Sequence, residues 1–145
     1  SSIPGLAGPA LPDLGSLVRD GVPPKVTSTT RDEHGAVYVT GTFIGDVLIG
    51  NTIINSRGDK DVFLLKLDPA GSFQWIRAVG SADVESAPRV SIDGAGRVSV
   101  IGMTKGEMDC GTGPLGVWKS ETFFLCIFGG DGASLVSGVF PTGRP

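Results

Sequence analysis

The sequence has little of what enzymes and metal sites use most. Its single histidine, His34, excludes sites with several histidine ligands. A Ser-His-Asp triad would need this same His34, which we expect in a solvated Asp-Glu-His-Gly turn, and there is no G-x-S-x-G motif. The two cysteines, Cys110 and Cys126, do not have the C-x-x-C spacing of redox or zinc motifs. We therefore predict a protein without enzymatic activity, without a cofactor and without a bound metal.

Basic residues and long apolar segments are also scarce. Twelve Lys and Arg residues stand against fifteen Asp and Glu residues, for a net charge of −3. This charge does not supply the basic surface that nucleic acids or anionic membranes attract. The longest apolar run, Phe123 to Phe128, is far shorter than the ~20 residues of a membrane-spanning helix. We expect neither a nucleic-acid partner nor membrane insertion.

Glycine, by contrast, is abundant. The chain has 23 glycines and 10 prolines in 145 residues, so glycine is about twice as frequent as the usual ~7%. These residues favour tight turns between short strands and disfavour long helices. The composition therefore predicts an all-β fold.

An internal repeat organises the sequence. The segment DEHGAVYVTG at 32–41 returns as DGAGRVSVIG at 93–102, an offset of 61 positions. The same offset pairs Val37 with Val98 and Val39 with Val100, in the alternating pattern of a strand. It also aligns, without a gap, Gly45 with Gly106, Gly50 with Gly111, Phe63 with Phe124, Leu64 with Leu125, and Gly71 with Gly132. The sequence thus predicts a duplicated unit.

Each copy is predicted to be a four-stranded antiparallel meander. The expected strands are 26–30, 36–40, 62–67 and 73–79 in the first copy, and 89–92, 97–101, 123–128 and 134–140 in the second. Between the second and third strands lies an insertion, 45–56 or 106–117, which we expect to form a hairpin of its own. We divide the chain into a Pro/Gly-rich extension or linker at 1–24, a first repeat at 25–80, and a second repeat with a short tail at 81–145.

The first copy closely resembles the bacterial β-propeller repeats of the SBBP type. The resemblance rests on the patterns D-x-x-G-x-V-x-V-x-G and D-x-F-L-x-K-L-D-x-x-G-x-x-x-W, and on a Gly-Thr-Phe segment followed by spaced glycines. The matching residues are Asp32, Gly35, Val37, Val39, Gly41, Thr42, Phe43, Gly45, Gly50, Asp61, Phe63, Leu64, Lys66, Leu67, Asp68, Gly71 and Trp75. The second copy departs from the pattern at Lys119, Thr122, Ile127 and Gly129.

This resemblance implies two four-stranded blades of a β-propeller and an extracellular, periplasmic or bacterial cell-surface protein. Propellers close with 4–8 blades, so two blades need further blades, identical copies or a larger complex to cover their flanks. We accordingly expect a structural or protein-interaction module. A carbohydrate-binding, lectin-like oligomer is the alternative function, and a two-sheet β-sandwich is the alternative fold.

A few residues could carry a more specific role. Cys110 and Cys126 fall on strands that can pair, and the sequence leaves open a disulfide or two buried thiols. Trp118, expected in a loop, is the candidate for contact with a ligand or partner, whereas Trp75 is expected to be structural.

The remaining candidates all have simpler interpretations. Glu107 and Asp109 alternate along a strand, as an acid/base pair could, but solvent-facing charge explains them as well. The acidic segments 59–61 and 83–85 lack the spacing of a calcium loop. The Gly-Ala-Gly segment at 94–96 is predicted to be a hairpin turn and not a phosphate loop.

Overall fold

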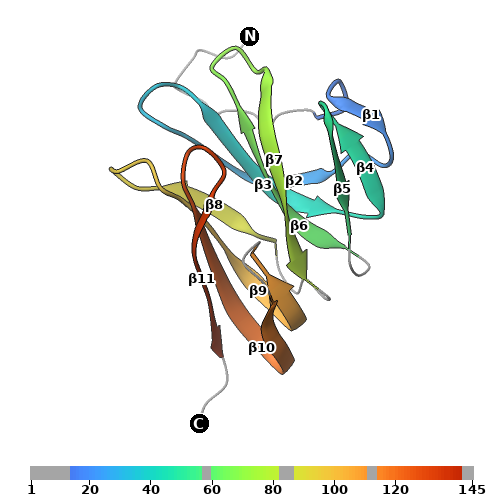
Figure 1. Cartoon of the computed structure of the whole chain (residues 1–145), viewed down its shortest axis with the longest axis vertical. Helices are drawn as coiled ribbons and strands as arrows, with labels where there is room; N and C mark the ends of the chain where they lie inside the picture. The colour runs from blue at the N-terminus through green and yellow to red at the C-terminus, as the bar shows by residue number, and fades with distance from the viewer. Residues whose placement is uncertain (1–13, 57–59, 82–86, 111–113, 142–145) are drawn as a thin grey trace.

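The computed structural model describes residues 14–56, 60–81, 87–110 and 114–141. The prediction of an all-β class is confirmed: the described residues form antiparallel strands, and none of their sheets closes on itself. The strands form three layers. In Figure 1 the first layer has β8 and β11 on the left and β9 and β10 at the bottom, the second has β2, β3, β6 and β7 in the middle, and the third has β1, β4 and β5 on the right.

The middle layer is a four-stranded meander, which we call the first sheet. Its strands are β2 (Lys25–Arg31), β3 (Val37–Phe43), β6 (Asp61–Leu67) and β7 (Phe73–Ser81), paired in that order. Six of the seven residues of β6 are buried, as expected for a strand covered on both faces.

The second sheet repeats this arrangement with β8 (Arg89–Ile92), β9 (Val98–Asp109), β10 (Pro114–Phe128) and β11 (Ser134–Pro141). Its strands also pair in the same register. Val39 lies opposite Thr29 and Leu65 in the first sheet, and the residues 61 positions later, Val100, Val90 and Cys126, are paired in the same way. Leu65 pairs with Ile76 and Cys126 with Ser137, again at the same offset.

The third layer is a small sheet that covers the first sheet from the other side. The insertion of the first repeat forms the hairpin of β4 (Asp46–Ile49) and β5 (Thr52–Asn55), and β1 (Val18–Asp20) pairs with β4. Part of the predicted extension therefore packs on the first sheet, where Leu14 is buried.

Aspartate-led turns join several of the strands. Asp32 accepts hydrogen bonds at Oδ1 from the backbone N–H groups of His34 and Ala36, both at 2.9 Å. Asp68 and Asp93 hold their turns through the same two bonds. Gly35 closes the first turn at a φ of 89°, a conformation that favours glycine. These three aspartates thus have a local structural role.

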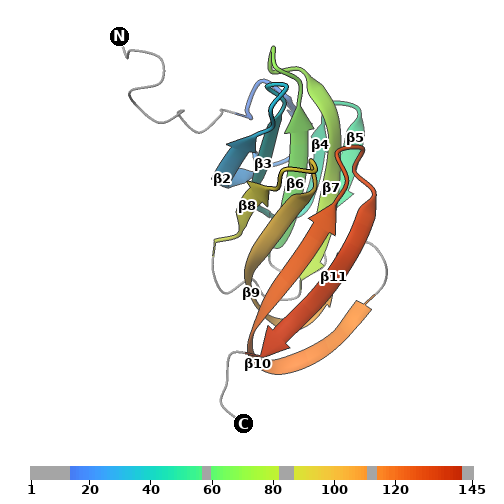
Figure 2. The same cartoon turned by 90° about the vertical axis from the view of Figure 1, so that its left-hand side faces the viewer.

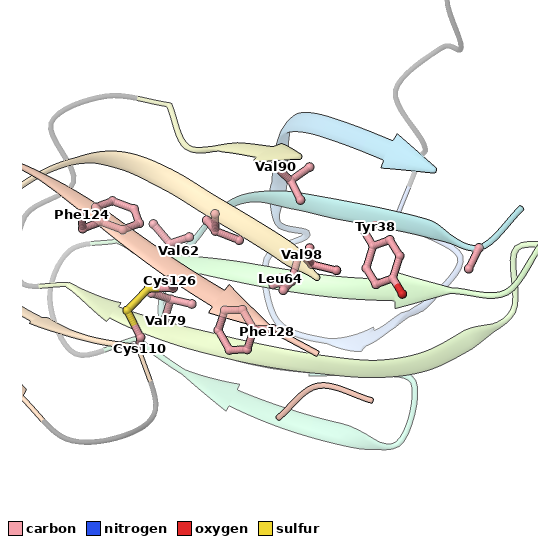
Figure 3. Packing of buried hydrophobic residues seen from close by; sticks show 12 residues of the cluster. Tyr38, Val62, Leu64, Val79, Val90, Val98, Cys110, Phe124, Cys126 and Phe128 are labelled. Carbon is pink, nitrogen blue, oxygen red and sulfur yellow. A yellow bond between two sulfur atoms is a disulfide. The ribbon is translucent and has the colours of Figure 1, made fainter. Parts of the chain in front are cut away.

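Two apolar cores separate the three layers. One lies between the two four-stranded sheets and contains Tyr38, Leu64, Val98, Phe124 and Phe128 among others (Figure 3). The other lies between the first sheet and the small sheet and includes Leu14, Val39, Ile49, Phe63 and Leu65. The first sheet is therefore covered on both faces, whereas the described residues form a core on only one face of the second sheet.

Candidate functional site

The two faces of each four-stranded sheet are distinguished by the residues of the third strand. We call the face of the first sheet with Val62 and Leu64 its front, and the face with Phe63 and Leu65 its back. At the offset of 61 positions, the front of the second sheet carries Phe123 and Leu125, and its back carries Phe124 and Cys126. Because side chains alternate along a strand, these assignments extend to the neighbouring strands.

The sheets pack front to back. Val62 and Leu64 from the front of the first sheet share one core with Phe124 and Cys126 from the back of the second (Figure 3). The sheets thus use opposite faces at their interface, as in a succession of equivalent units. A two-fold arrangement would bring the same faces together.

Polar side chains of the first sheet fix this interface at one end. Lys66 Nζ and Trp75 Nε1 both donate to the carbonyl oxygen of Gly130, at 3.0 and 3.1 Å, and Arg77 Nε donates to that of Gly132 at 3.1 Å. Both acceptors belong to the turn between β10 and β11. Trp75 is therefore a structural residue of the interface, and its ring also carries the Arg77 guanidinium at 5.1 Å.

A disulfide between Cys110 and Cys126 lies in the same interface (Figure 3). The two Cα atoms are 5.7 Å apart, within the usual range for this bond. Cys110 directly follows β9, and Cys126 lies near the end of β10, so the bond ties the ends of the two strands together. The residues 61 positions earlier, Ile49 and Leu65, are both buried in the core beneath the β4–β5 hairpin.

The front of the second sheet is partly exposed, although its described residues on β9 and β10 are mostly apolar. Ile101 and Phe123 are each 42% exposed. Leu125 and Ile127 are half-buried. We call the surface formed by Ile101, Phe123, Leu125 and Ile127 the open face.

The matching positions of the first sheet are covered. Thr40, Val62 and Leu64, which correspond to Ile101, Phe123 and Leu125, are each 0% exposed. Lys66, the counterpart of Ile127, reaches across the interface to Gly130. The open face is therefore more apolar than the front of the first sheet, although the front of the first sheet is the one that is covered. Contiguous exposed apolar residues of this kind mark docking surfaces in soluble proteins.

Other candidate residues are less favourably placed. His34 is exposed in its turn, where Nε2 lies 3.5 Å from Glu33. This turn borders a shallow groove of about 280 Å³ that the Gly-Ala-Gly turn at 94–96 also lines. No three His, Cys, Asp or Glu side chains gather as metal ligands in the part of the chain that the structure describes.

The predicted acidic candidates divide into described and undescribed residues. Lys60 is exposed and Asp61 is buried at the start of β6, whereas residue 59 and residues 83–85 lie outside the described ranges. Asp109 is only 8% exposed, so the interpretation as solvent-facing charge is wrong for this residue. The side chain of Glu107 is outside the described part. Asp109 lies where the end of β9 pairs with the end of β7. Sequence patterns within single strands do not reveal this pairing.

Trp118 is not in a loop. Its backbone belongs to β10 and pairs with Gly106 of β9, because the insertion continues these strands instead of interrupting them. The side chain of Trp118 lies outside the described part, so its contact with a ligand stays a prediction. None of the described residues forms a helix of the length and apolarity that a membrane crossing requires.

The open face is the surface that sequence reasoning missed. The sequence predicted exposed flanks of the blades in general. The one sequence signal for this particular face is the offset of the repeat, which aligns Phe123 with Val62. Comparisons of the chain with protein-family models and with curated proteins give no match.

Proposed function

We propose that the chain is a non-enzymatic structural or protein-interaction module, a two-blade portion of a β-propeller whose open face is covered by another protein sheet. The open face carries this proposal, because Ile101 and Phe123 are apolar and exposed where their counterparts in the first sheet, Thr40 and Val62, are buried. Burial of such a surface supplies the main driving force of protein association.

The front-to-back packing favours blades over a two-fold sandwich. Each interface of this kind joins the front of one sheet to the back of the next. In a row of such sheets, the last sheet therefore has a front without a partner. In this chain that end is the second sheet, since the small sheet covers the back of the first. The partner we propose is therefore a protein surface and not a small ligand.

The experiment compares two double variants of the full chain. Ile101→Asp with Phe123→Asp places charge on the open face, and Ile44→Asp with Ile53→Asp places it at apolar positions elsewhere that are somewhat more exposed. We expect the first variant to bind several-fold less of a hydrophobic dye than the parent chain, while its unfolding free energy changes by no more than about 0.5 kcal/mol per site. The control variant should keep most of the dye binding.

A loss of stability as large as that of a core substitution in the open-face variant would contradict the proposal. It would mean that Ile101 and Phe123 serve the fold of the isolated chain and not a partner. The proposed location outside the cytosol agrees with the disulfide, because such bonds persist in oxidising compartments. Localisation itself stays a prediction.

A further inference from the structure

The first sheet binds the backbone of the second sheet where β2 and β8 are neighbours. Ser28 Oγ accepts a hydrogen bond from the backbone N–H of Val90 at 3.2 Å. Thr27 Oγ1 donates to the carbonyl oxygen of Pro88 at 2.6 Å. Together with the bonds to the turn between β10 and β11, these contacts mean that the front of the first sheet recognises backbone groups of the sheet that covers it.

The second sheet has a different residue at each of these positions. Pro88 replaces Thr27 and has no hydroxyl group. Arg89 replaces Ser28, and it cannot accept a backbone N–H because a guanidinium donates hydrogen bonds and accepts none. None of the side-chain contacts of the first interface can therefore form again at the front of the second sheet. The three donors to the turn are replaced by residues whose side chains donate no hydrogen bond, namely Ile127, Val136 and Gly138.

Arg89 lies beside the open face. It is opposite Ile101 in the pairing of β8 with β9, and residues that are opposite each other in an antiparallel pair point to the same face of the sheet. The Arg89 side chain is exposed and forms no hydrogen bond or ion pair within the described part of the chain. Figure 2 shows the second sheet from the side away from the first sheet, with β8 and β11 at its opposite edges. The front of the second sheet thus combines exposed apolar residues with a cationic group at the β8 edge.

We infer that the partner of the open face is a different protein, whose covering sheet carries apolar side chains over Ile101 and Phe123 and a carboxylate over Arg89. The inference rests on the proposed function and names the chemistry of its partner. A carboxylate accepts two parallel hydrogen bonds from a guanidinium, and it removes the cost of covering Arg89 without a counter-charge. Arginine is also enriched at protein interfaces.

The same residues disfavour a further sheet of this repeat as the occupant. Such a sheet would place a backbone N–H, the equivalent of that of Val90, against the Arg89 guanidinium. It would also bury the carbonyl oxygens equivalent to those of Gly130 and Gly132 against apolar side chains. Buried polar groups without hydrogen-bond partners are costly. The open face therefore discriminates against its own repeat by the same exchange of residues that favours an acidic partner.

Two hydrophobic dyes measure the role of Arg89 in the full chain, one an anionic anilinonaphthalene sulfonate and the other uncharged. We expect Arg89→Ser to weaken binding of the anionic dye about three- to fivefold and to leave binding of the uncharged dye unchanged. Added salt should weaken binding of the anionic dye in the parent chain and not in this variant, since salt screens exposed charges. Arg31→Ser removes an exposed arginine at the end of β2. This matched control should bind both dyes as the parent chain does.

Two labelled, end-blocked peptides of alternating valine and threonine then stand in for the partner. One has a central glutamate and the other a central glutamine, and fluorescence anisotropy measures their affinities. We expect the parent chain to bind the glutamate peptide about three- to fivefold more tightly than the glutamine peptide. Arg89→Ser should bind the two peptides equally, and the variant with Ile101→Asp and Phe123→Asp should bind neither.

The outcomes separate the inference from the proposed function. Equal affinity of the two peptides for the parent chain would overturn the inference, while loss of dye binding in the variant with Ile101→Asp and Phe123→Asp would still support the proposed function. Dye binding that this variant leaves unchanged would contradict the proposed function itself.

Two further results would identify another occupant and overturn the inference. Association of the parent chain that Arg89→Ser weakens would show that a second copy supplies the carboxylate. Binding to vesicles that contain phosphatidylserine, abolished by Arg89→Ser and combined with equal peptide affinities, would identify an anionic membrane.

Discussion

The two four-stranded sheets share one register and differ in what covers them. The first sheet lies between two apolar cores, and its third strand is buried on both faces. The second sheet has the same ladders, but its front exposes Ile101 and Phe123. The comparison teaches that the same ladders can sit in different surroundings: the first sheet is stabilised by a neighbour on either side, and the second by the first sheet on its back.

The sharpest way to test this difference uses one pair of equivalent leucines. Leu64 is 0% exposed at the front of the first sheet, and Leu125 is its half-buried counterpart. We expect Leu64→Ala to lower the unfolding free energy by about 2–5 kcal/mol, because it leaves a cavity in a packed core. Leu125→Ala should cost roughly 1 kcal/mol or less.

Denaturant unfolding of both variants measures the two changes. Equal losses would show that the front of the second sheet is already packed in the isolated chain. That result would remove the difference on which the proposed function rests.

The disulfide offers a second comparison of the sheets. Cys110 and Cys126 are joined covalently where Ile49 and Leu65 are only packed in one core. Replacing both cysteines by alanine should lower the unfolding free energy by about 3 kcal/mol, as expected for a closed loop of about 15 residues. Chemical reduction of the parent chain should have a similar effect, and an unchanged stability after verified reduction would contradict it.

A smaller effect is expected at the polar end of the interface. Lys66 donates to Gly130 and lies over the ring of Tyr38, with Nζ 5.5 Å from the ring centroid, whereas its counterpart in the second sheet is Ile127. Lys66→Ile should cost about 1 kcal/mol of unfolding free energy through the lost hydrogen bond and cation–π contact. Arg77→Met tests the neighbouring bond to Gly132 in the same assay. If neither variant is destabilised, the turn between β10 and β11 is not held by the first sheet.

The smallest effect concerns the turn of Asp93. Hydrogen bonds from the Arg97 backbone and side chain lower the pKa of this carboxyl below its ordinary value of 3.8, with a further bond from the Ala95 backbone. Since the pKa is lower in the folded state, the stabilisation is present above the ordinary value and is lost as the pH falls through the folded one.

The Asp93→Asn variant measures this contribution. The difference in stability from the parent chain should be constant between neutral pH and about pH 5, and should shrink below about pH 4. Thermal unfolding across this range tests it, and a difference that grows on acidification would contradict the assignment. Asp32 has Ala36 in place of Arg97, so the turn of the first sheet offers a comparison without the arginine.

Much of the fold followed from local sequence. The alternation of Val37 and Val39, the Asp-x-x-Gly turns and the Gly-punctuated insertion each fixed a strand or a turn, because these patterns depend on neighbouring residues. The prediction of a loop at Trp118 was wrong because glycines around an insertion are compatible both with a loop that leaves the sheet and with strands that continue through the insertion.

The site depended on information that no single segment contains. Whether Phe123 is covered is decided by the sheet that packs against it, and strand alternation alone does not reveal the partner. The pairing of the ends of β7 and β9 likewise joins residues far apart in the sequence, Gly80 and Asp109. Only the offset of the repeat, applied to the observed contacts, connects these positions.

The most direct test of the docking surface is the solution mass of the purified chain, measured by light scattering across a dilution series with and without reductant. We predict concentration-dependent association of the 14.9 kDa chain, which Ile101→Asp with Phe123→Asp abolishes and Ile44→Asp with Ile53→Asp retains. A parent chain that stays a well-behaved monomer at every concentration, indistinguishable from the open-face variant, would contradict the account and favour a self-sufficient sandwich.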